Sequence, residues 1–376
     1  MLKIEGRTES SPSNDKEKKY ITVDDLYRQS SQFEIWSFIP ETLEQTRRQA
    51  NQKGTRAATA KLEDTLAAFE SENTDIYRTL KDELTPEKLL SVVSYDEEVR
   101  YLSFYSKNII PTANFFKMPT QVKASAVSFF KKFYLVNSVM EYHPKNIMYT
   151  CVFLAAKSEN YFISIDSFCK ALKNTSAKEI LDLEFIILQS LKFTLLVHHP
   201  FRPLYGFFLD FQAILLHPLP VMYDVSVDSI GELYDKSKLW LNDYALLSDV
   251  AFLFTPPQIA LAAMYNVDRK ITESYLKHKF LKTLQASNDD LKNSGTTEVD
   301  TENTQTTNEN KSESEQQRRD HYEHLVRTIR KCIKLAKQIP DTTREESREI
   351  DRKCFYALKP KMLIEKKIRK LSSATT

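Results

Sequence analysis

Two charged side chains lie where the sequence is otherwise apolar. In "TCVFLAAKSEN", Thr150 to Asn160, an apolar run ends abruptly in Lys157. In "LDLEFIILQSL", Glu184 follows Leu183 and precedes Phe185, Ile186 and Ile187. A lysine in the last turn of a helix is stabilised by the helix dipole by about 0.3–1 kcal/mol, so Lys157 alone indicates a helix-terminal charge. A carboxylate in an apolar setting is either solvated on an outer face or paired, and both readings of Glu184 stay open here.

The remaining reactive residues do not form a recognisable catalytic or metal-binding set. His198 and His199 are adjacent, so their side chains point in different directions, and no nearby acid or cysteine completes a ligand set. We therefore expect a turn with hydrogen-bonded histidines and no metal. The chain has no Ser-His-Asp spacing, no glycine-rich phosphate loop and no kinase H-R-D or D-F-G motif. The sequence thus predicts neither an enzyme nor a cofactor-binding protein.

Composition excludes several further classes. The formal net charge of +2 over 376 residues gives no global basic field, so direct nucleic-acid binding is not expected. No window approaches the ~20 apolar residues that cross a bilayer, and the polar first twenty residues do not resemble a signal peptide. The four cysteines form no C-x-x-C pair, and Cys151 sits in an apolar helix. This usage is typical of buried thiols in a reducing compartment.

Helix signals dominate the chain. Only five glycines occur, which disfavours hairpin-rich β folds. Ser94 with Glu97, and Ser176 with Glu179, have the spacing of capping boxes. Pro144 starts a helix that is apolar on all sides from Ile147 to Ala156, which is typical of a central helix. A second proline-initiated apolar helix follows Thr255. We predict an all-α protein with two similar helical domains.

Composition also suggests the domain limits. We expect a disordered tail at 1–19, an N-terminal helical extension at 20–90, a first repeat at 91–197, a second repeat at 198–338, and a C-terminal helix with a basic tail at 339–376. Residues 285–317 carry eight acidic residues against two lysines and no aromatic residue, which predicts a loop or linker. The basic run from Lys359 to Lys370 fits a solvated helix face, a nuclear import patch or a nucleic-acid contact.

Several stretches resemble a known family. "FFKKFYLVNSVMEYHPKNIMYTCVFLAAKSENYF" resembles the cyclin box of the cyclin H family, and "EFIILQSLKFTLLVHHPFRPLYGFFLDFQ" and "LLSDVAFLFTPPQIALAAM" resemble it at corresponding places. "SSQFEIWSF", which lies outside the generic cyclin box, is more specific to cyclin H. The resemblance spans most of residues 25–282 and, more loosely, 318–370. It is to members of the fungal type, and the acidic insert departs from the shorter connection of animal members.

The resemblance implies an all-α fold of two tandem five-helix cyclin-box repeats with additional N- and C-terminal helices. It also implies a regulatory, non-enzymatic subunit that activates a cyclin-dependent kinase 7-type catalytic subunit. The implied further partners are a RING-finger assembly factor and the TFIIH core, in the nucleus, with phosphorylation of the RNA polymerase II C-terminal domain as the output. The alternatives are another transcriptional cyclin and a TFIIB-like cyclin-fold adaptor.

The resemblance also assigns residues to the contact with the kinase. In cyclins a lysine at the end of the third helix and a glutamate in the fifth face the kinase, and these match Lys157 and Glu184. Leu154, Phe193 and Leu195 match apolar contact positions. The sequence departs from the pattern at Ser158, where many cyclins carry a large apolar residue.

Overall fold

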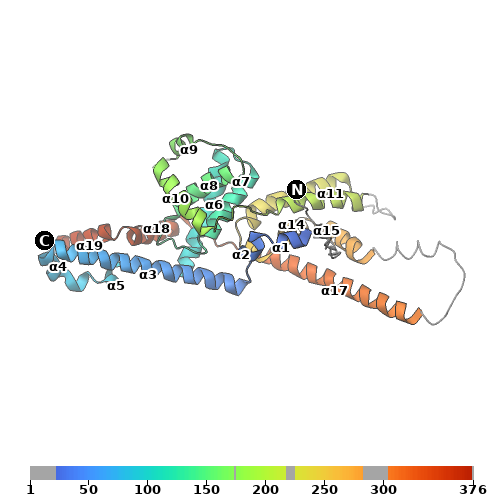
Figure 1. The fold of residues 1–376 in the computed structure, drawn as a ribbon, viewed down its shortest axis with the longest axis horizontal. Coiled ribbons are helices and arrows are strands. Elements are labelled where there is room, and N and C mark those ends of the chain that lie inside the picture. Colours follow the sequence, from blue (N-terminus) through green and yellow to red (C-terminus); the bar gives the residue numbers. More distant parts are fainter. Residues whose placement is uncertain (1–22, 173–174, 217–224, 283–303, 375–376) are drawn as a thin grey trace, which may run out of the picture.

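The computed structural model describes residues 23–172, 175–216, 225–282 and 304–374. All regular structure in these ranges is helical, so the predicted all-α class is confirmed (Figure 1). The predicted tail at 1–19 lies outside the described residues. The helices before the first repeat are α1 (Val23–Arg28), α2 (Ser31–Trp36), α3 (Pro40–Glu72), α4 (Thr74–Leu80), the short 3-10 helix η1 (Lys81–Glu83) and α5 (Pro86–Leu89).

Five helices build the first globular unit around a central one: α6 (Tyr95–Phe115), α7 (Thr120–Phe133), α8 (Pro144–Ser158), α9 (Ile165–Ala171) and α10 (Ala177–Ser190). Both predicted capping boxes are present, at the starts of α6 and α10. Helix α8 is the central helix, as the sequence predicts, and packs against α6, α7 and α10. Its residues from Thr150 to Ala156 are all buried, Cys151 among them.

The second unit repeats this design around α14. It consists of α11 (Phe201–Leu215), α12 (Val227–Trp240), α13 (Val250–Leu253), α14 (Pro256–Val267), α15 (Arg269–Lys277) and α17 (Thr304–Ala336), with π-helical turns η2 (Leu241–Ala245) and η3 (His278–Lys282). Thr255 is the N-cap of α14, and its N–H donates to Gln258 Oε1 at 3.0 Å. Residues Ile259 to Tyr265 are buried, so α14 occupies the position that α8 has in the first unit.

The predicted linker at 285–317 is wrong for its second half. Residues 283–303 lie outside the described residues, but from Thr304 onward the chain forms the first turns of α17. Extending an existing helix adds one hydrogen bond for each residue that is fixed, so a polar segment can continue a helix that is nucleated elsewhere. The amphipathic residues from about Tyr322, which pack in the second core, supply that nucleus.

Helices outside the two units form an elongated arm. Helices α3, α4 and α5 lie beside α18 (Arg344–Leu358) and α19 (Pro360–Ala374) at the left of Figure 1. A small core of Leu62, Leu66, Leu84 and Ile364 joins them. The sequence predicts one helix near the C-terminus, but the structure has two. The break falls at Lys359, because a residue before proline is driven out of the helical conformation.

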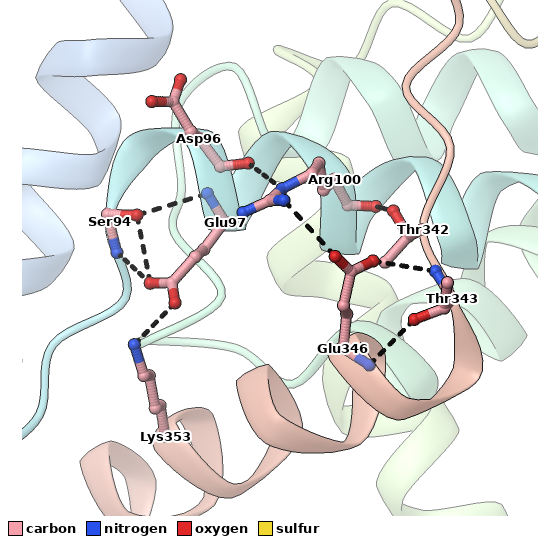
Figure 2. Close-up of polar contacts among 8 residues, drawn as sticks. All are labelled: Ser94, Asp96, Glu97, Arg100, Thr342, Thr343, Glu346 and Lys353. Atoms are coloured by element: carbon pink, nitrogen blue, oxygen red, sulfur yellow. Dashed lines mark hydrogen bonds and ion pairs between the residues drawn. The ribbon is translucent and has the colours of Figure 1, made fainter.

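The C-terminal helix α18 is fastened to the start of α6. Figure 2 shows the capping box at the start of each helix linked to the other helix. Lys353 Nζ donates to Glu97 Oε1 at 2.6 Å, and Thr342 Oγ1 donates to the Arg100 carbonyl at 2.8 Å. Arg100 also lies 3.7 Å from Glu346. The residues that start α6 are therefore also the residues that hold α18.

A buried carboxylate fixes the long helix α3 to the first unit. Glu98 is 6% exposed and accepts from Asn51 Nδ2 at 2.6 Å, from Ser138 Oγ at 2.8 Å and from the Val139 N–H at 2.7 Å. Burial raises the pKa of Glu98, and the three donors oppose that shift. Gly54 of α3 lies directly against Ser138, where a Cβ would come within 2.2 Å of the serine Cβ. Only glycine permits this approach.

A second carboxylate joins α3, α7 and the second unit. Asp249 accepts two hydrogen bonds from the Arg47 guanidinium, both at 2.7 Å, and lies 3.1 Å from Lys131 Nζ. Burial disfavours the Asp249 charge, but the two cations outweigh it and hold the pKa of Asp249 well below its usual range. This paired arginine and carboxylate set the orientation of the two units against α3.

Candidate functional site

Lys157 and Glu184, far apart in sequence, form an ion pair. Lys157 Nζ, in the last turn of α8, donates to both Glu184 carboxylate oxygens, at 2.8 and 2.9 Å. The ammonium also lies 4.7 Å from the centre of the Phe153 ring. The Lys157 side chain is 48% exposed and that of Glu184 is 15% exposed. Because such a half-exposed pair contributes only about 0–1 kcal/mol to folding, stability alone does not account for it.

Ser158 has a local structural role. Its Oγ donates to the carbonyl of Ala155 at 3.0 Å, within the last turn of α8. The same carbonyl also accepts from the Glu159 N–H at 3.0 Å, so the serine adds a second bond at the end of the helix. Many cyclins have a large apolar residue at this position. Ser158 takes its place without disturbing the end of α8, and the Ser158 side chain is half-buried.

The three apolar residues predicted for the site lie at different depths. Leu154 is 3% exposed and belongs to the first core, where it supports α8 from inside. Leu195 is half-buried and packs on the same core. Phe193 is 62% exposed. Of the three, Phe193 therefore offers the most apolar area at the surface beside the ion pair.

Two further exposed apolar side chains on α10 escaped the sequence analysis. Leu181 and Phe185 are 45% and 57% exposed, and the Phe185 ring lies 6.5 Å from that of Phe193. We call Leu181, Phe185 and Phe193 the apolar patch. The signal was present in the sequence: Leu181 and Phe185 are four residues apart and so share one helix face. The core-facing side of α10 is apolar as well, so the sequence alone does not show that Leu181 and Phe185 lie on the exposed side.

The backbone that carries Phe193 is strained. Helix α10 ends in a Schellman motif, in which the N–H of Phe193 bonds the Leu188 carbonyl and that of Lys192 bonds the Gln189 carbonyl, both at 2.9 Å. Lys192 occupies the position where glycine is usual, with φ of 52°, and Phe193 follows with φ of 57°. Such left-handed conformations cost of order 1–3 kcal/mol each outside glycine and concentrate at functional sites. They place the Phe193 ring against Phe185.

The comparisons with known proteins agree on one family. The profile "Cyclin, N-terminal domain" matches residues 75–196, and "Cyclin C-terminal domain" matches residues 199–337. The protein "Cyclin CCL1" of Saccharomyces cerevisiae is 39% identical over 279 residues, 73% of this chain and 67% of the relative. The chain belongs to the cyclin family. Within it the similarity is to the fungal cyclin-H type, and "Cyclin-H" of Xenopus laevis is 37% identical over 191 residues, 48% of this chain and 56% of that protein.

Two solved structures match the fold of this chain over most of its length. One is the "CAK complex" of Chaetomium thermophilum, whose matching chain is 26% identical with a TM-score of 0.62 over 93% of this chain and 90% of that one. Another is the yeast TFIIK complex of Kin28, Ccl1 and Tfb3, matched at 31% identity and a TM-score of 0.56 over 82% of this chain and 100% of that one. The predicted fold of two tandem cyclin-box repeats is therefore confirmed.

The histidine pair lies where the two cyclin repeats meet, and it holds α2 in place. The His198 backbone exchanges two hydrogen bonds with the Gln32 amide, at 2.7 and 3.2 Å. Trp36 Nε1 donates to Thr194 Oγ1 at 2.8 Å. The "SSQFEIWSF" stretch is the part of the sequence most specific to cyclin H. It therefore binds α2 to the segment between the two repeats.

His199 is half-buried by its exposed surface and stays uncharged in this cyclin. Its Nε2 lies 2.9 Å from Ser125 Oγ, which donates to Glu159 at 2.5 Å. Burial, with the nearby charge of Lys132, lowers the pKa of His199 to about 4. Within the described ranges no three metal-ligating side chains gather, and no helix there is long and apolar enough to span a bilayer.

Proposed function

We propose that this cyclin binds and activates a cyclin-dependent kinase 7-type catalytic subunit and has no catalytic activity of its own. The observation that carries the proposal is the Lys157–Glu184 ion pair beside the exposed apolar patch. The pair adds little to folding, yet the fold holds it in one geometry. Its remaining donor and acceptor capacity is available to a partner's backbone, while the patch offers area that a partner can cover.

The mechanism is a shift in the kinase's conformational population. A kinase of this class needs the Lys–Glu ion pair of its β3 strand and αC helix to position the nucleotide phosphates. A partner that binds the αC-in conformation more tightly shifts the population toward it. A shift from 1:99 to 99:1 requires about 5.5 kcal/mol of differential affinity. Burial of three large apolar side chains contributes about 1.5–3 kcal/mol each when complete, so the apolar patch is large enough for this task.

The assembly that we propose follows the same resemblance. The solved TFIIK complex brings together Kin28, Ccl1 and Tfb3, and this chain is similar to its cyclin chain over most of its length. We therefore propose a RING-finger assembly factor and the TFIIH core as further partners, action in the nucleus, and support of RNA polymerase II C-terminal domain phosphorylation and transcription initiation.

Two alternatives receive less support. Another transcriptional cyclin would share the fold, but "Cyclin-C1-1" of Arabidopsis thaliana is 26% identical, below the 39% of Cyclin CCL1. A TFIIB-like adaptor usually brings a zinc ribbon, and the described residues hold no group of side chains suited to a metal ion. A salt-sensitive gel shift of DNA by the isolated chain would favour the adaptor.

The test uses the purified chain and the purified kinase subunit. We expect Glu184→Ala and Phe193→Ala each to lower kinase activation at least tenfold, since central interface residues cost about 2 kcal/mol or more when truncated. Asp182→Ala is the matched control, because Asp182 is an exposed acidic residue on the same helix α10. Melting curves confirm that each variant folds. Normal activation by a Lys157→Ala, Glu184→Ala double variant would refute the assigned site.

A further inference from the structure

The C-terminal half of α17, the long orange helix at the lower right of Figure 1, carries cations without any acidic residue between them. We call these five side chains the basic stripe: Arg327, Arg330, Lys331, Lys334 and Lys337. All five are exposed, and each lies three or four residues from another, so they share one face of the helix. Lys337 directly follows α17, but its N–H still donates to the Ile333 carbonyl at 3.3 Å and so continues the helical path.

The other face of α17 holds the basic stripe in its direction. Val326, Ile329, Cys332 and Ala336 are buried and belong to the core of the second repeat. Because this packing fixes the rotation of the helix about its own axis, the five cations stay turned toward solvent. The basic stripe is thus a surface with a defined geometry.

The basic stripe works against the stability of its own helix. Like charges three or four residues apart destabilise a helix, and the stripe contains three such pairs at a spacing of three and two at a spacing of four. The helix dipole favours cations in the last turn, which accounts for Lys334 and Lys337. It does not account for Arg327, Arg330 or Lys331, so folding alone does not explain the stripe.

Acidic residues compensate only one end of the basic stripe. Arg327 pairs with Glu323 at 2.7 Å, and Arg330 lies 3.8 Å from Glu273. The other three cations, Lys331, Lys334 and Lys337, form no ion pair with the described residues. Each ammonium has three donors and no acceptor, so the carboxylates of a partner would find free donors there.

A further cation lies beside the basic stripe on α15. The Arg269 and Arg330 guanidinium carbons lie 6.0 and 5.9 Å from the centre of the Tyr265 ring. Both arginines face Glu273, which lies 2.8 Å from Arg269 Nε, so one carboxylate serves two cations. Arg269 stands in the first turn of α15, where the helix dipole favours anions. Two helices therefore collect positive charge here against their local preference.

The length and the surroundings of the basic stripe favour a short acidic peptide over a nucleic acid. Ten residues separate Arg327 from Lys337, which is about 15 Å along a helix and about five residues of an extended peptide. The exposed carboxylates of Glu323 and Asp341 bound the stripe at its two ends. A nucleic-acid strand carries a charge on every nucleotide and would continue over these carboxylates. The stripe also holds no aromatic ring on which a base could stack.

We propose that the basic stripe is a docking surface for a short acidic segment of a partner protein. Aspartate or glutamate side chains of that segment bind the ammonium groups of Lys331, Lys334 and Lys337. The stripe belongs to the second repeat, whereas the ion pair and the apolar patch belong to the first, so this docking surface does not depend on the proposed kinase contact.

The probe for this surface is a fluorescent hexaglutamate peptide, whose binding to the purified full chain is measured by fluorescence anisotropy. We expect binding at about 0.1 M salt that is lost at about 1 M, because the Debye length falls from about 10 Å to about 3 Å. The double variant Lys331→Gln, Lys334→Gln should weaken the affinity by about fivefold or more, since it removes two ion pairs. The double variant Lys331→Arg, Lys334→Arg keeps both charges and should keep the affinity.

The matched control is the double variant Lys361→Gln, Lys366→Gln, which removes the same charge from exposed positions of α19. It should bind hexaglutamate as the parent chain does. Melting curves check the folding of every variant, and the glutamine variant of the stripe should be at least as stable as the parent, because it removes like-charge pairs.

The absence of hexaglutamate binding at about 0.1 M salt would overturn the proposal, as would an equal loss of affinity in the stripe variant and the control. Tighter binding of an oligouridine RNA that is lost in the stripe variant would assign the surface to nucleic acid instead. A second measurement needs no variant: carbodiimide coupling of the peptide carboxylates, followed by mass spectrometry, should place the crosslinks on the three unpaired lysines of the stripe. Crosslinks that fall equally on the lysines of α19 would contradict the proposal.

Discussion

Replacing Gly54 by alanine tests the contact that fixes α3 to the first repeat. A Cβ at this position would lie 2.2 Å from Ser138 Cβ and 2.4 Å from its Oγ, whereas non-bonded carbon atoms prefer about 3.5–4.0 Å. The overlap exceeds 1 Å, and such overpacking costs about 1–3 kcal/mol. The displaced hydroxyl also loses its 2.8 Å bond to Glu98, and bonds to charged groups contribute about 1.5–3 kcal/mol. The higher helix propensity of alanine returns about 1 kcal/mol, so we expect a net loss of about 2–4 kcal/mol.

The same substitution elsewhere provides the control. Gly231 lies within α12, and no atom lies within 4 Å of the place that an alanine Cβ would take there, so Gly231→Ala should stabilise the chain by about 1 kcal/mol. Urea denaturation followed by circular dichroism measures both changes, and hydrogen exchange of the α3 amides locates the first. If Gly54→Ala were as stable as the parent while Gly231→Ala showed its gain, the close approach of α3 to Ser138 would not exist.

Three further outcomes follow from the structure. Asp249→Asn should lower the free energy of unfolding by about 1–3 kcal/mol. We expect the lower part of this range, because the Asp249 side chain is 38% exposed and solvent screens its charge. Since its folded pKa lies well below the unfolded value of about 3.9, the stabilisation is fully present above that pH and is lost progressively as the pH falls from there toward the folded pKa. The urea midpoints of parent and variant should keep their separation from about pH 7 to pH 5 and begin to converge only below about pH 4. Glu98→Gln should lower the free energy of unfolding by about 1–3 kcal/mol in the same assay. The glutamine amide would place an N–H₂ donor against the three donors that now bond the Glu98 carboxylate. An unchanged urea midpoint would contradict these hydrogen bonds. Lys117→Gly should raise the free energy of unfolding by about 1 kcal/mol, since Lys117 has φ of 54° at the end of α6; a lower melting temperature would refute this.

The sequence predicts the local features of this fold well because their causes are local. A capping box is a three-residue relationship, and those at Ser94 and Ser176 are present in the structure. The burial of α8 and α14 follows from apolar residues on every side of each helix. The pairing of Lys157 with Glu184 came from the cyclin resemblance, since no local rule relates residues 27 positions apart.

Features that depend on tertiary contacts escaped the sequence analysis. Nothing local distinguishes Gly54 from a flexible glycine, because its role is set by Ser138 more than eighty residues away. Leu154 is an apolar residue in a helix whether it faces a partner or the core, and only packing places it in the core. The helical conformation of residues 304–317 likewise depends on the rest of α17, which packs on the second repeat.

The linkage of α18 to α6 has a consequence for the order of folding during synthesis. Glu97 and Arg100 belong to the first helix of the first repeat, yet their partners lie beyond residue 340, after the whole second repeat. The hydroxyl of Tyr101, whose ring is buried in the first core, likewise donates to Asp351 at 2.5 Å. The ribosome therefore delivers the first repeat long before the residues that complete it. We expect the nascent chain to hold an unfinished first repeat until α18 emerges, so the folding of the first repeat should finish only after the second repeat has been made.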